Sequence, residues 1–256
     1  MILTYIQQIE SAQQLVQNAS SLAFGLEKSF GILFYVEKIE MQEKYGNDIR
    51  KLLASQNLVD VKIYILCGSL IELQSNCDEI DASFLLLQCV DERKKTILQL
   101  LSACRELRIP YLLHKDSFRN FDFRKVILPI GFLEEEMEKT QFAAAFGRFF
   151  DSEVLMVLAN DYGSKAAANA EKMKLFFSIF KFQFSLQKAK SDSFGVEKES
   201  IIIAIGANSG LLIISASREY GLDDIIFGPN ELHIVRKSTV PVLLVNPRGD
   251  LYALCD

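Results

Sequence analysis

Short apolar runs alternate with polar and amphipathic stretches along the chain, and residues 211–247 show the pattern most clearly. Leu211–Ile214 and Val240–Val245 are continuous and rich in branched side chains, which is typical of strands covered on both faces. Ser215–Asp224 is expected to form a loop at the carboxyl end of the first strand. Gly228-Pro229-Asn230 should then open a helix with Asn230 as its N-cap. Loops of this kind in open parallel sheets bind ligands, often phosphates.

The same alternation predicts the other elements. In the first half, strands are expected at Ile2–Ile6, Gly31–Val36, Val61–Leu66, Phe84–Leu87 and Ile109–Leu113, and helices at Ser11–Lys28, Tyr45–Ser55, Ile71–Ile80 and Lys94–Leu107. In the second half, strands are expected at Val126–Ile130, Val154–Leu158 and Phe182–Ala189, and helices at Glu134–Phe150, Lys165–Phe180 and within Gly195–Asn208. Strands that alternate with helices indicate an α/β fold with parallel sheets.

The two halves repeat each other. Ala23-Phe24-Gly25 precedes the apolar run Ile32–Val36, and Ala145-Phe146-Gly147 precedes Val154–Leu158 in the same register. Pro110-Tyr111-Leu112-Leu113 likewise matches Pro241-Val242-Leu243-Leu244. Two copies of one α/β unit explain these matches. We therefore expect two Rossmann-like domains in tandem, each a doubly wound parallel sheet, at residues 1–116 and 124–256, joined by a polar and aromatic linker.

The second half resembles the universal stress protein family. That family ends with a strand, a glycine-bearing phosphate loop, a helix and a last strand that reads roughly P-V-L-L-V, as Pro241–Val245 does here. The resemblance implies an adenine nucleotide alpha hydrolase-like fold. It also implies that the last strands pair between domains or subunits, so that the chain would form an intramolecular pseudo-dimer and could also form a homodimer.

The nucleotide-binding branch of that family carries G-x2-G-x9-G-[ST] in the phosphate loop. The four defined positions fall here on Ser215, Arg218, Gly228 and Pro229, so one glycine is kept. Side chains then stand where phosphate needs close approach to the backbone, and Pro229 lacks an N–H. The family's nucleoside-binding aspartate would fall on Gly131.

An anion could still bind in the second half. Candidate contacts are Gly131, Ser215, Ser217, Arg218, Gly228 and Asn230. The alternative is a collapsed loop in which Arg218 lies in solvent or pairs with a nearby carboxylate. In the first half, the loop Gln88–Lys94 has no glycine, and we expect no nucleotide there.

Composition narrows the function classes. Half of the residues are hydrophobic, which allows real cores, and the net charge of −5 with scattered basic residues argues against nucleic acid or an anionic membrane as the main partner. Five cysteines without a C-x-x-C pair indicate reduced thiols in a cytoplasmic protein with no disulfides. Ser200–Ser217 carries no charge, but Asn208-Ser209-Gly210 interrupts it, so we expect a buried helix and strand rather than a membrane span.

Other chemical signals are sparse. His114 and His233 lie in different halves and no acid-flanked serine or cysteine nucleophile is apparent, so a hydrolytic triad has no support. Glu134–Glu136 is interpreted as the solvated first turn of a helix. Cys89 is the one thiol whose reactivity is worth testing, with an inert buried thiol as the favoured interpretation.

The favoured hypothesis is a non-enzymatic, stress-associated regulatory or scaffold protein that acts on an unknown protein partner, with ATP binding lost or weakened and no cofactor. One alternative is a sensor that binds ATP, AMP or another small anion through the second domain, with slow hydrolysis as its enzymatic version. Another is a regulatory module of a membrane transporter, which would not itself insert into the membrane.

Overall fold

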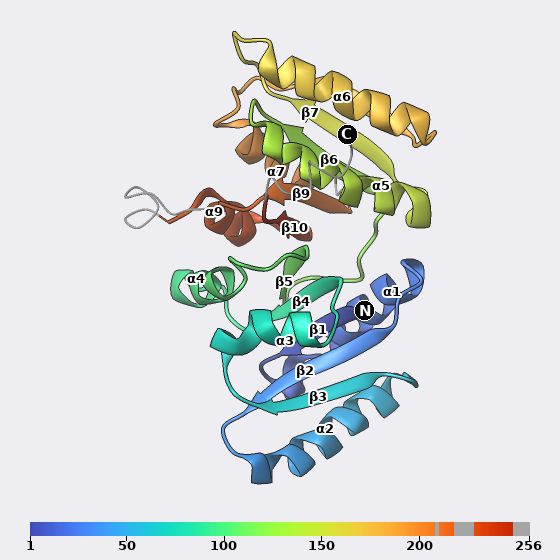
Figure 1. Cartoon of the computed structure of the whole chain (residues 1–256), viewed down its shortest axis with the longest axis vertical. Helices are drawn as coiled ribbons and strands as arrows, with labels where there is room; N and C mark the ends of the chain where they lie inside the picture. Colours follow the sequence, from blue (N-terminus) through green and yellow to red (C-terminus); the bar gives the residue numbers. More distant parts are fainter. Residues whose placement is uncertain (208–209, 218–227, 248–256) are drawn as a thin grey trace. The chain divides into compact units, whose positions relative to one another are not determined.

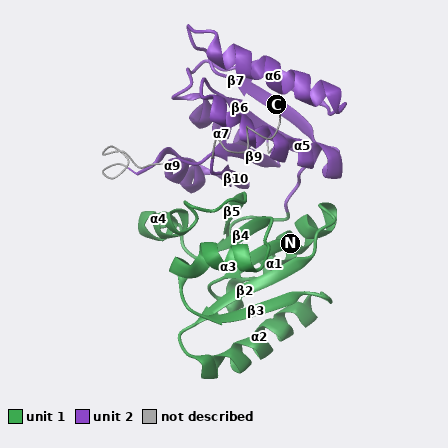
Figure 2. Ribbon diagram, viewed as in Figure 1, with its two compact units in different colours: residues 1–120 green, residues 121–256 purple. Residues whose placement is uncertain are grey.

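The chain is described from a computed structural model, which covers residues 1–207, 210–217 and 228–247. It divides into two compact units, Met1–Asn120 and Phe121–Asp256, coloured separately in Figure 2. Each unit is described by itself.

Unit 1 alternates strands and helices from its first residue (Figure 1). Its strands are β1 (Ile2–Ile6), β2 (Phe30–Val36), β3 (Lys62–Cys67), β4 (Phe84–Cys89) and β5 (Tyr111–Lys115). Its α-helices are α1 (Gln13–Gly25), α2 (Gln42–Ser55), α3 (Leu73–Glu79) and α4 (Lys94–Ala103), with single-turn 3-10 helices η1 (Ile9–Ser11), η2 (Ile39–Met41) and η3 (Leu70–Glu72) before the first three of them. The short helix expected at Ile71–Ile80 is thus a 3-10 turn that continues into α3.

Unit 2 repeats the order. Its strands are β6 (Lys125–Ile130), β7 (Glu153–Leu158), β8 (Phe184–Lys188), β9 (Leu211–Ser215) and β10 (Val242–Val245). Its helices are η4 (Glu134–Glu138), α5 (Lys139–Phe150), α6 (Lys165–Ile179), α7 (Val196–Gly206) and α9 (Asn230–Lys237).

Both sheets are parallel, as the α/β prediction requires. In unit 1 the strand order is β3-β2-β1-β4-β5, with Ile2 beside both Phe30 and Phe84. In unit 2 it is β8-β7-β6-β9-β10, which is the same winding. Because parallel crossovers are right-handed, α5 and α6 cover one face of the unit 2 sheet, while α7 and α9 lie in contact on the other. The carboxyl ends of all strands in a unit therefore share one edge.

Helices α1, α3, α4 and α6 end one to four residues earlier than the apolar pattern predicts, whereas α2 and α5 end at the predicted residue. The chain turns into the left-handed region at Glu27, Asn57, Asp81, Asp151 and Lys181, with φ from 51° to 60°. A residue in this conformation ends a helix, because the backbone can no longer continue the helical turn. Glycine is the residue most often found at such a position. α1 accordingly ends at Gly25 instead of Lys28, because Glu27 leaves the helix at φ 55°.

The phenylalanine-rich segment 176–184 is core only in part. Phe177 is fully buried under the sheet of unit 2 and packs against Phe184, with ring centroids 5.8 Å apart. Phe180 remains 56% exposed and stacks on Phe182. Only the residues that point toward the sheet join the core, which the dense run of phenylalanines does not reveal.

Gly210 fills a place where no side chain fits, just before β9. A Cβ built on it would overlap the backbone carbonyl of Asp122, whereas a Cβ on Gly206 at the end of α7 meets nothing within 4 Å. Gly210→Ala should therefore lower the free energy of unfolding by about 3 kcal/mol or prevent folding, since backbone has to move. Gly206→Ala should be neutral or stabilising by about 0.5–1 kcal/mol. Urea denaturation of both variants tests this, and equal stabilities would contradict it.

A buried carboxylate cluster at the strand ends of unit 2

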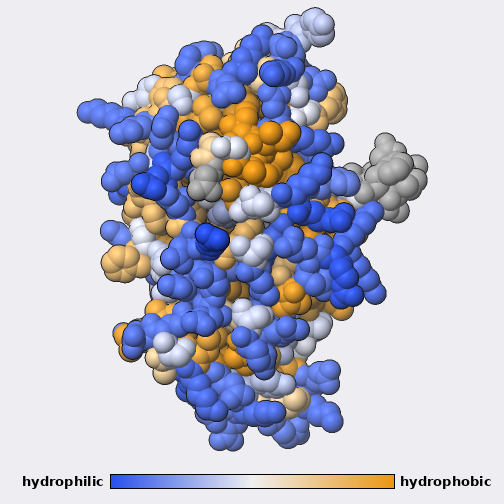
Figure 3. All heavy atoms as spheres, turned by 180° about the vertical axis from the view of Figure 1, so that it is seen from behind, coloured by the Kyte–Doolittle hydropathy of each residue, from blue (hydrophilic) through white to orange (hydrophobic). Residues whose placement is uncertain are grey.

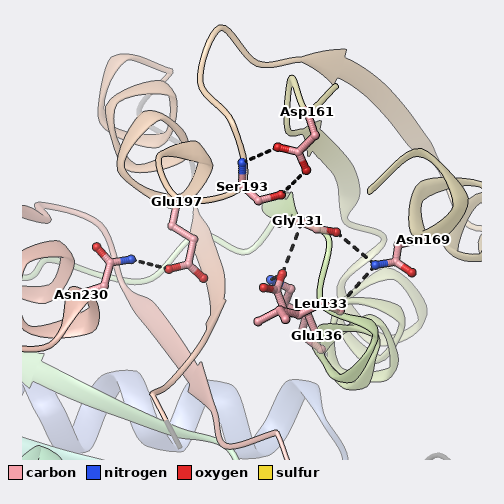
Figure 4. Close-up of polar contacts among 9 residues, drawn as sticks. Gly131, Leu133, Glu136, Asp161, Asn169, Ser193, Glu197 and Asn230 are labelled. Atoms are coloured by element: carbon pink, nitrogen blue, oxygen red, sulfur yellow. Dashed lines mark hydrogen bonds and ion pairs between the residues drawn. The ribbon is translucent and has the colours of Figure 1, made fainter. Parts of the chain in front are cut away.

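The carboxyl edge of unit 2 gathers most of the residues that the sequence singled out. Gly131 follows β6, Ser215 ends β9, Ser217 lies two residues beyond it, and Asn230 begins α9. The edge also receives three carboxylates that sequence reasoning did not place there, from Glu136, Glu197 and Glu231 (Figure 4 shows the first two).

Glu231 of α9 directs its carboxylate to Ser217, two residues beyond β9. Its Oε1 accepts a hydrogen bond from the backbone N–H of Ser217 at 3.2 Å, and its Oε2 accepts one from the Ser217 hydroxyl at 2.7 Å. Glu231 is 2% exposed and lies in the first turn of α9, where the helix dipole favours a negative charge. The loop donors and the helix terminus expected to meet a phosphate thus meet a carboxylate of the chain itself.

Asn230 is not the N-cap of α9. Pro229 takes that position, with φ −65° and ψ 160°, and Asn230 is the first helical residue. The side chain of Asn230 is directed to α7 instead, where its Nδ2 donates to Glu197 Oε2 at 2.6 Å (Figure 4). Proline suits an N-terminal position because no N–H is needed there, and this releases Asn230 for a tertiary contact.

Glu136 fills the space beside Gly131. The Gly131 N–H donates to Glu136 Oε2 at 3.4 Å, and the same oxygen accepts from Lys139 Nζ at 3.2 Å (Figure 4 draws the first). The Lys139 side chain is completely buried and that of Glu136 is 16% exposed. The interpretation of Glu134–Glu136 as a solvated turn is therefore wrong for Glu136, because the 3-10 turn η4 folds it back over the strand end.

Two further side chains hold the loops around Gly131. Asn169 of α6 donates from Nδ2 to the Gly131 carbonyl at 3.0 Å and to the Leu133 carbonyl at 3.2 Å. Asp161, in the loop after β7, accepts from the Ser193 N–H at 2.9 Å and from its hydroxyl at 2.5 Å (Figure 4). In both contacts, polar groups of the edge form hydrogen bonds with other groups of the protein.

The environment of the cluster disfavours the charged form of Glu197. Loss of hydration raises the pKa of Glu197 from the ordinary 4.5 to about 7, with Glu136 and Glu231 acting in the same direction. Lys139 and the Asn230 amide oppose this rise. Near neutral pH the edge therefore contains carboxylates whose charges are compensated by one buried ammonium and a few hydrogen-bond donors.

The other predicted residues contribute less. Ser215 pairs with Val245 in the sheet and is partly buried, and Gly228 adopts φ 90°, a conformation that favours glycine. Arg218 lies outside the described residues. The structure thus brings Gly131, Ser217 and Asn230 to the carboxylates and leaves Ser215 in the strand.

Unit 1 has a corresponding arrangement at the start of α4. Asp91 accepts hydrogen bonds from the Arg93 N–H at 2.9 Å and from its guanidinium at 2.8 Å, which holds the pKa of Asp91 well below its usual range. Cys89 is buried just before it, and burial raises the pKa of this thiol to about 11, which favours the inert interpretation. An internal carboxylate again lies at the helix start.

Several solved structures have an architecture similar to that of this chain. A universal stress protein from Archaeoglobus fulgidus superposes with a TM-score of 0.72 and 13% identity, over 97% of both chains. The chain has the universal stress protein fold. A putative universal stress protein from Pseudomonas aeruginosa gives a TM-score of 0.61 and 13% identity, over 99% of this chain and 95% of the other. The cytoplasmic domain of a prokaryotic cation chloride cotransporter gives 0.55 and 12%, over 96% and 95%. No protein-family model and no curated protein matches the sequence significantly.

Among residues 1–207, 210–217 and 228–247, no three His, Cys, Asp or Glu side chains are arranged to hold a metal ion. His114 is buried against Asn18, and loss of hydration lowers its pKa to about 4. No helix in the described ranges is long and apolar enough to cross a membrane. The edge of unit 2 is built to hold carboxylates.

Sequence reasoning missed four residues because they reach the edge through tertiary packing: Glu136, Lys139, Glu197 and Glu231. One local signal existed. Glu231 directly follows Pro229-Asn230 in the first turn of a predicted helix, where an acidic side chain can meet loop donors. The spacing of Glu136 and Lys139 is the ordinary spacing of a surface pair, and their burial could not be read from it.

Glu197 should make stability depend on pH. Its pKa is raised in the folded state, so the folded chain binds more protons between pH 4.5 and 7, and stability falls as pH rises through that window. Glu197→Gln keeps an acceptor for Asn230, so we expect it to raise the free energy of unfolding at pH 8 by about 1–3 kcal/mol and to change it little at pH 4.5.

Glu199 on the same helix is the matched control. Backbone N–H groups of Lys190 and Ser191 hold its pKa below the ordinary 4.5, so its stabilisation is present above pH 4.5 and is lost as pH falls. Glu199→Gln should therefore destabilise the protein at pH 8. Urea denaturation from pH 4.5 to 8 measures both, and effects of the same sign would contradict this account.

Lys139 should matter far more than an exposed lysine with the same pairing. Lys139→Met leaves Glu136 buried without its ammonium partner, so we expect a loss of about 3–5 kcal/mol and a higher pKa for Glu197. Lys174 pairs with Glu171 at the same i,i+3 spacing at 2.9 Å, but with a side chain that is 35% exposed. Lys174→Met should cost at most about 1 kcal/mol. Thermal and urea unfolding compare the two, and equal losses would refute the role of Lys139.

Proposed function

We propose that this protein is a regulatory or scaffold protein with the universal stress protein fold, which acts through protein contacts and binds ATP weakly or not at all. The observation that carries the proposal is the pair of hydrogen bonds from Ser217 to the buried carboxylate of Glu231. A backbone N–H and a hydroxyl at the end of a parallel strand are the donors that a phosphate would need.

Charge strengthens the proposal. Two like charges about 4 Å apart repel by roughly 1 kcal/mol in water and 4 kcal/mol near a protein surface. A triphosphate would have to approach Glu231 and Glu136, and the ammonium group of Lys139 is already paired with Glu136. Displacing Glu231 would also leave a buried carboxylate without its donors, which costs further free energy.

Gly131, where the family's nucleoside-binding aspartate would fall, lies close to other side chains. A Cβ at Gly131 would lie 3.2 Å from Ser193 Oγ and 3.3 Å from the Glu136 carboxylate, so the space beside Gly131 is already filled. Close approach of a nucleoside to this backbone would require Glu136 to move.

One observation favours a second candidate, a regulatory module that works with a membrane transporter. The cotransporter cytoplasmic domain matches over nearly the whole chain, at a TM-score of 0.55. Co-purification with detergent-extracted membranes, compared with the soluble fraction, would separate this role from a soluble scaffold.

Titration with ATP and AMP tests the loss of nucleotide binding. We expect no saturable binding by calorimetry up to millimolar nucleotide at pH 7.5, and no nucleotide released from the purified, denatured protein in mass spectrometry. Glu231→Gln combined with Glu136→Gln removes two repulsive charges and should lower the Kd for ATP at least tenfold, to about 0.1 mM.

Glu171→Gln combined with Glu135→Gln is the charge-matched control, because both residues lie on unit 2 outside the cluster, and it should leave ATP binding unchanged. Stoichiometric nucleotide in the wild-type protein, lost on Arg218→Ala, would overturn the proposal and favour a nucleotide sensor.

A further inference from the structure

α7 is apolar on two sides, although it lies on the surface of unit 2. Ile201 and Ala204 are 3% and 0% exposed and pack inward, as predicted for a buried helix. Ile202, however, is 70% exposed and Ile205 38% exposed, so the prediction of a fully buried helix is wrong. Figure 3, which views the molecule from behind, shows hydrophobic atoms gathered on this side of unit 2. A helix that is hydrophobic all round is normally covered on both sides.

A groove runs beside these isoleucines, between α7 and α9. It has a volume of about 290 Å³ and is lined by Lys198, Ile201, Ile202, His233, Ile234 and Lys237. Its floor is apolar, since Ile201 and Ile234 are almost completely buried. The volume lies at the lower limit for pockets that enclose a drug-sized ligand, so it suits a few inserted apolar side chains better than a whole small molecule.

The rim of the groove is basic. Lys198 precedes Ile202 by one helical turn on α7, and Lys237 follows His233 by one turn on α9, so both ammonium groups flank the isoleucine floor. Both lysines are exposed, and in the described parts of the chain neither forms an ion pair. The carboxylates of these two helices are directed elsewhere: Glu197 and Glu231 lie in the buried cluster, and Glu199 binds backbone N–H groups near Lys190.

We propose that the groove between α7 and α9 docks an amphipathic helix of a protein partner, with an apolar stripe flanked by carboxylates. A narrow apolar floor with a rim of one charge sign is the arrangement by which helices are held in grooves, where anchors at i, i+3, i+4 and i+7 enter the floor. The isoleucines supply the buried contact, and Lys198 and Lys237 select acidic partners over basic ones. This inference rests on the proposed function and specifies the chemistry of its partner.

The test uses the full chain and a fluorescein-labelled synthetic peptide of roughly four helical turns, with leucines on one stripe and glutamates beside them. The matched peptide has lysine at each glutamate position. By fluorescence anisotropy we expect the acidic peptide to bind at least tenfold more tightly than the basic one. Ile202→Asp should weaken that binding at least tenfold, and the charge reversal Lys198→Glu with Lys237→Glu should make the basic peptide the tighter ligand.

Matched controls lie elsewhere on the surface. Ile71 is 92% exposed in unit 1, and Lys165 is exposed on α6, so Ile71→Asp and Lys165→Glu should change the Kd less than twofold. Circular dichroism and thermal unfolding establish that every variant is folded.

Several results would overturn the proposal. These are equal affinity for both peptides, equal losses in the control variants, or binding to phosphatidylglycerol vesicles that Ile202→Asp abolishes while the peptide does not bind. A dimer that Ile202→Asp dissociates would assign the face to a second copy. At least tenfold tighter peptide binding after removal of residues 248–256 would assign it to the chain's own segment.

The two proposals fail separately. A protein that binds ATP tightly and still selects the acidic peptide would refute the loss of nucleotide binding and keep the groove. A protein that binds neither would refute the groove alone.

Discussion

The arrangement of side chains at the carboxyl edge of unit 2 depends on the hydrogen bonds that Ser217 donates to Glu231. Polar donors at the carboxyl end of a parallel strand must be satisfied, and an open site leaves that to water or a ligand. Here the chain supplies its own anion from the first turn of α9. Once Glu231 is buried there, Glu197 and Glu136 share a poorly hydrated environment with it, and Lys139 becomes necessary as their counter-charge. The carboxylates at this edge are thus held by hydrogen-bond donors and by one buried ammonium group.

Unit 1 reaches a similar result with different residues. Asp91 turns back on the N–H and guanidinium of Arg93 at the start of α4, so a carboxylate again takes the place that favours an anion. The likeness to solved universal stress proteins at 13% identity concerns the fold, and function has to be argued from these sites. In both units a carboxylate of the chain thus meets internal donors beyond the carboxyl end of a strand.

The apolar groove on the surface of unit 2 lies between α7 and α9. α7 and α9 serve two purposes, since their inner carboxylates close the ligand edge while their outer side chains form a basic groove with an isoleucine floor. A partner that docks on preformed helices loses less free energy to ordering than one that binds a flexible segment.

The sequence by itself determined the α/β class and the parallel direction of the strands. Buried strands appear as continuous apolar runs rich in branched side chains, and their alternation with helices permits few topologies. It also located the loop after β9 and the disrupted glycine pattern. Only the tertiary structure showed that Ser217, two residues beyond β9, donates hydrogen bonds to Glu231. The turn Glu134–Glu136 was interpreted as solvated, Asn230 as a cap, and the helix that contains Ile202 as buried. The contacts of Glu136 and Asn230 and the exposure of Ile202 correct these interpretations. The end of α1 was equally hidden, since Glu27 adopts a backbone conformation that local propensity assigns to glycine.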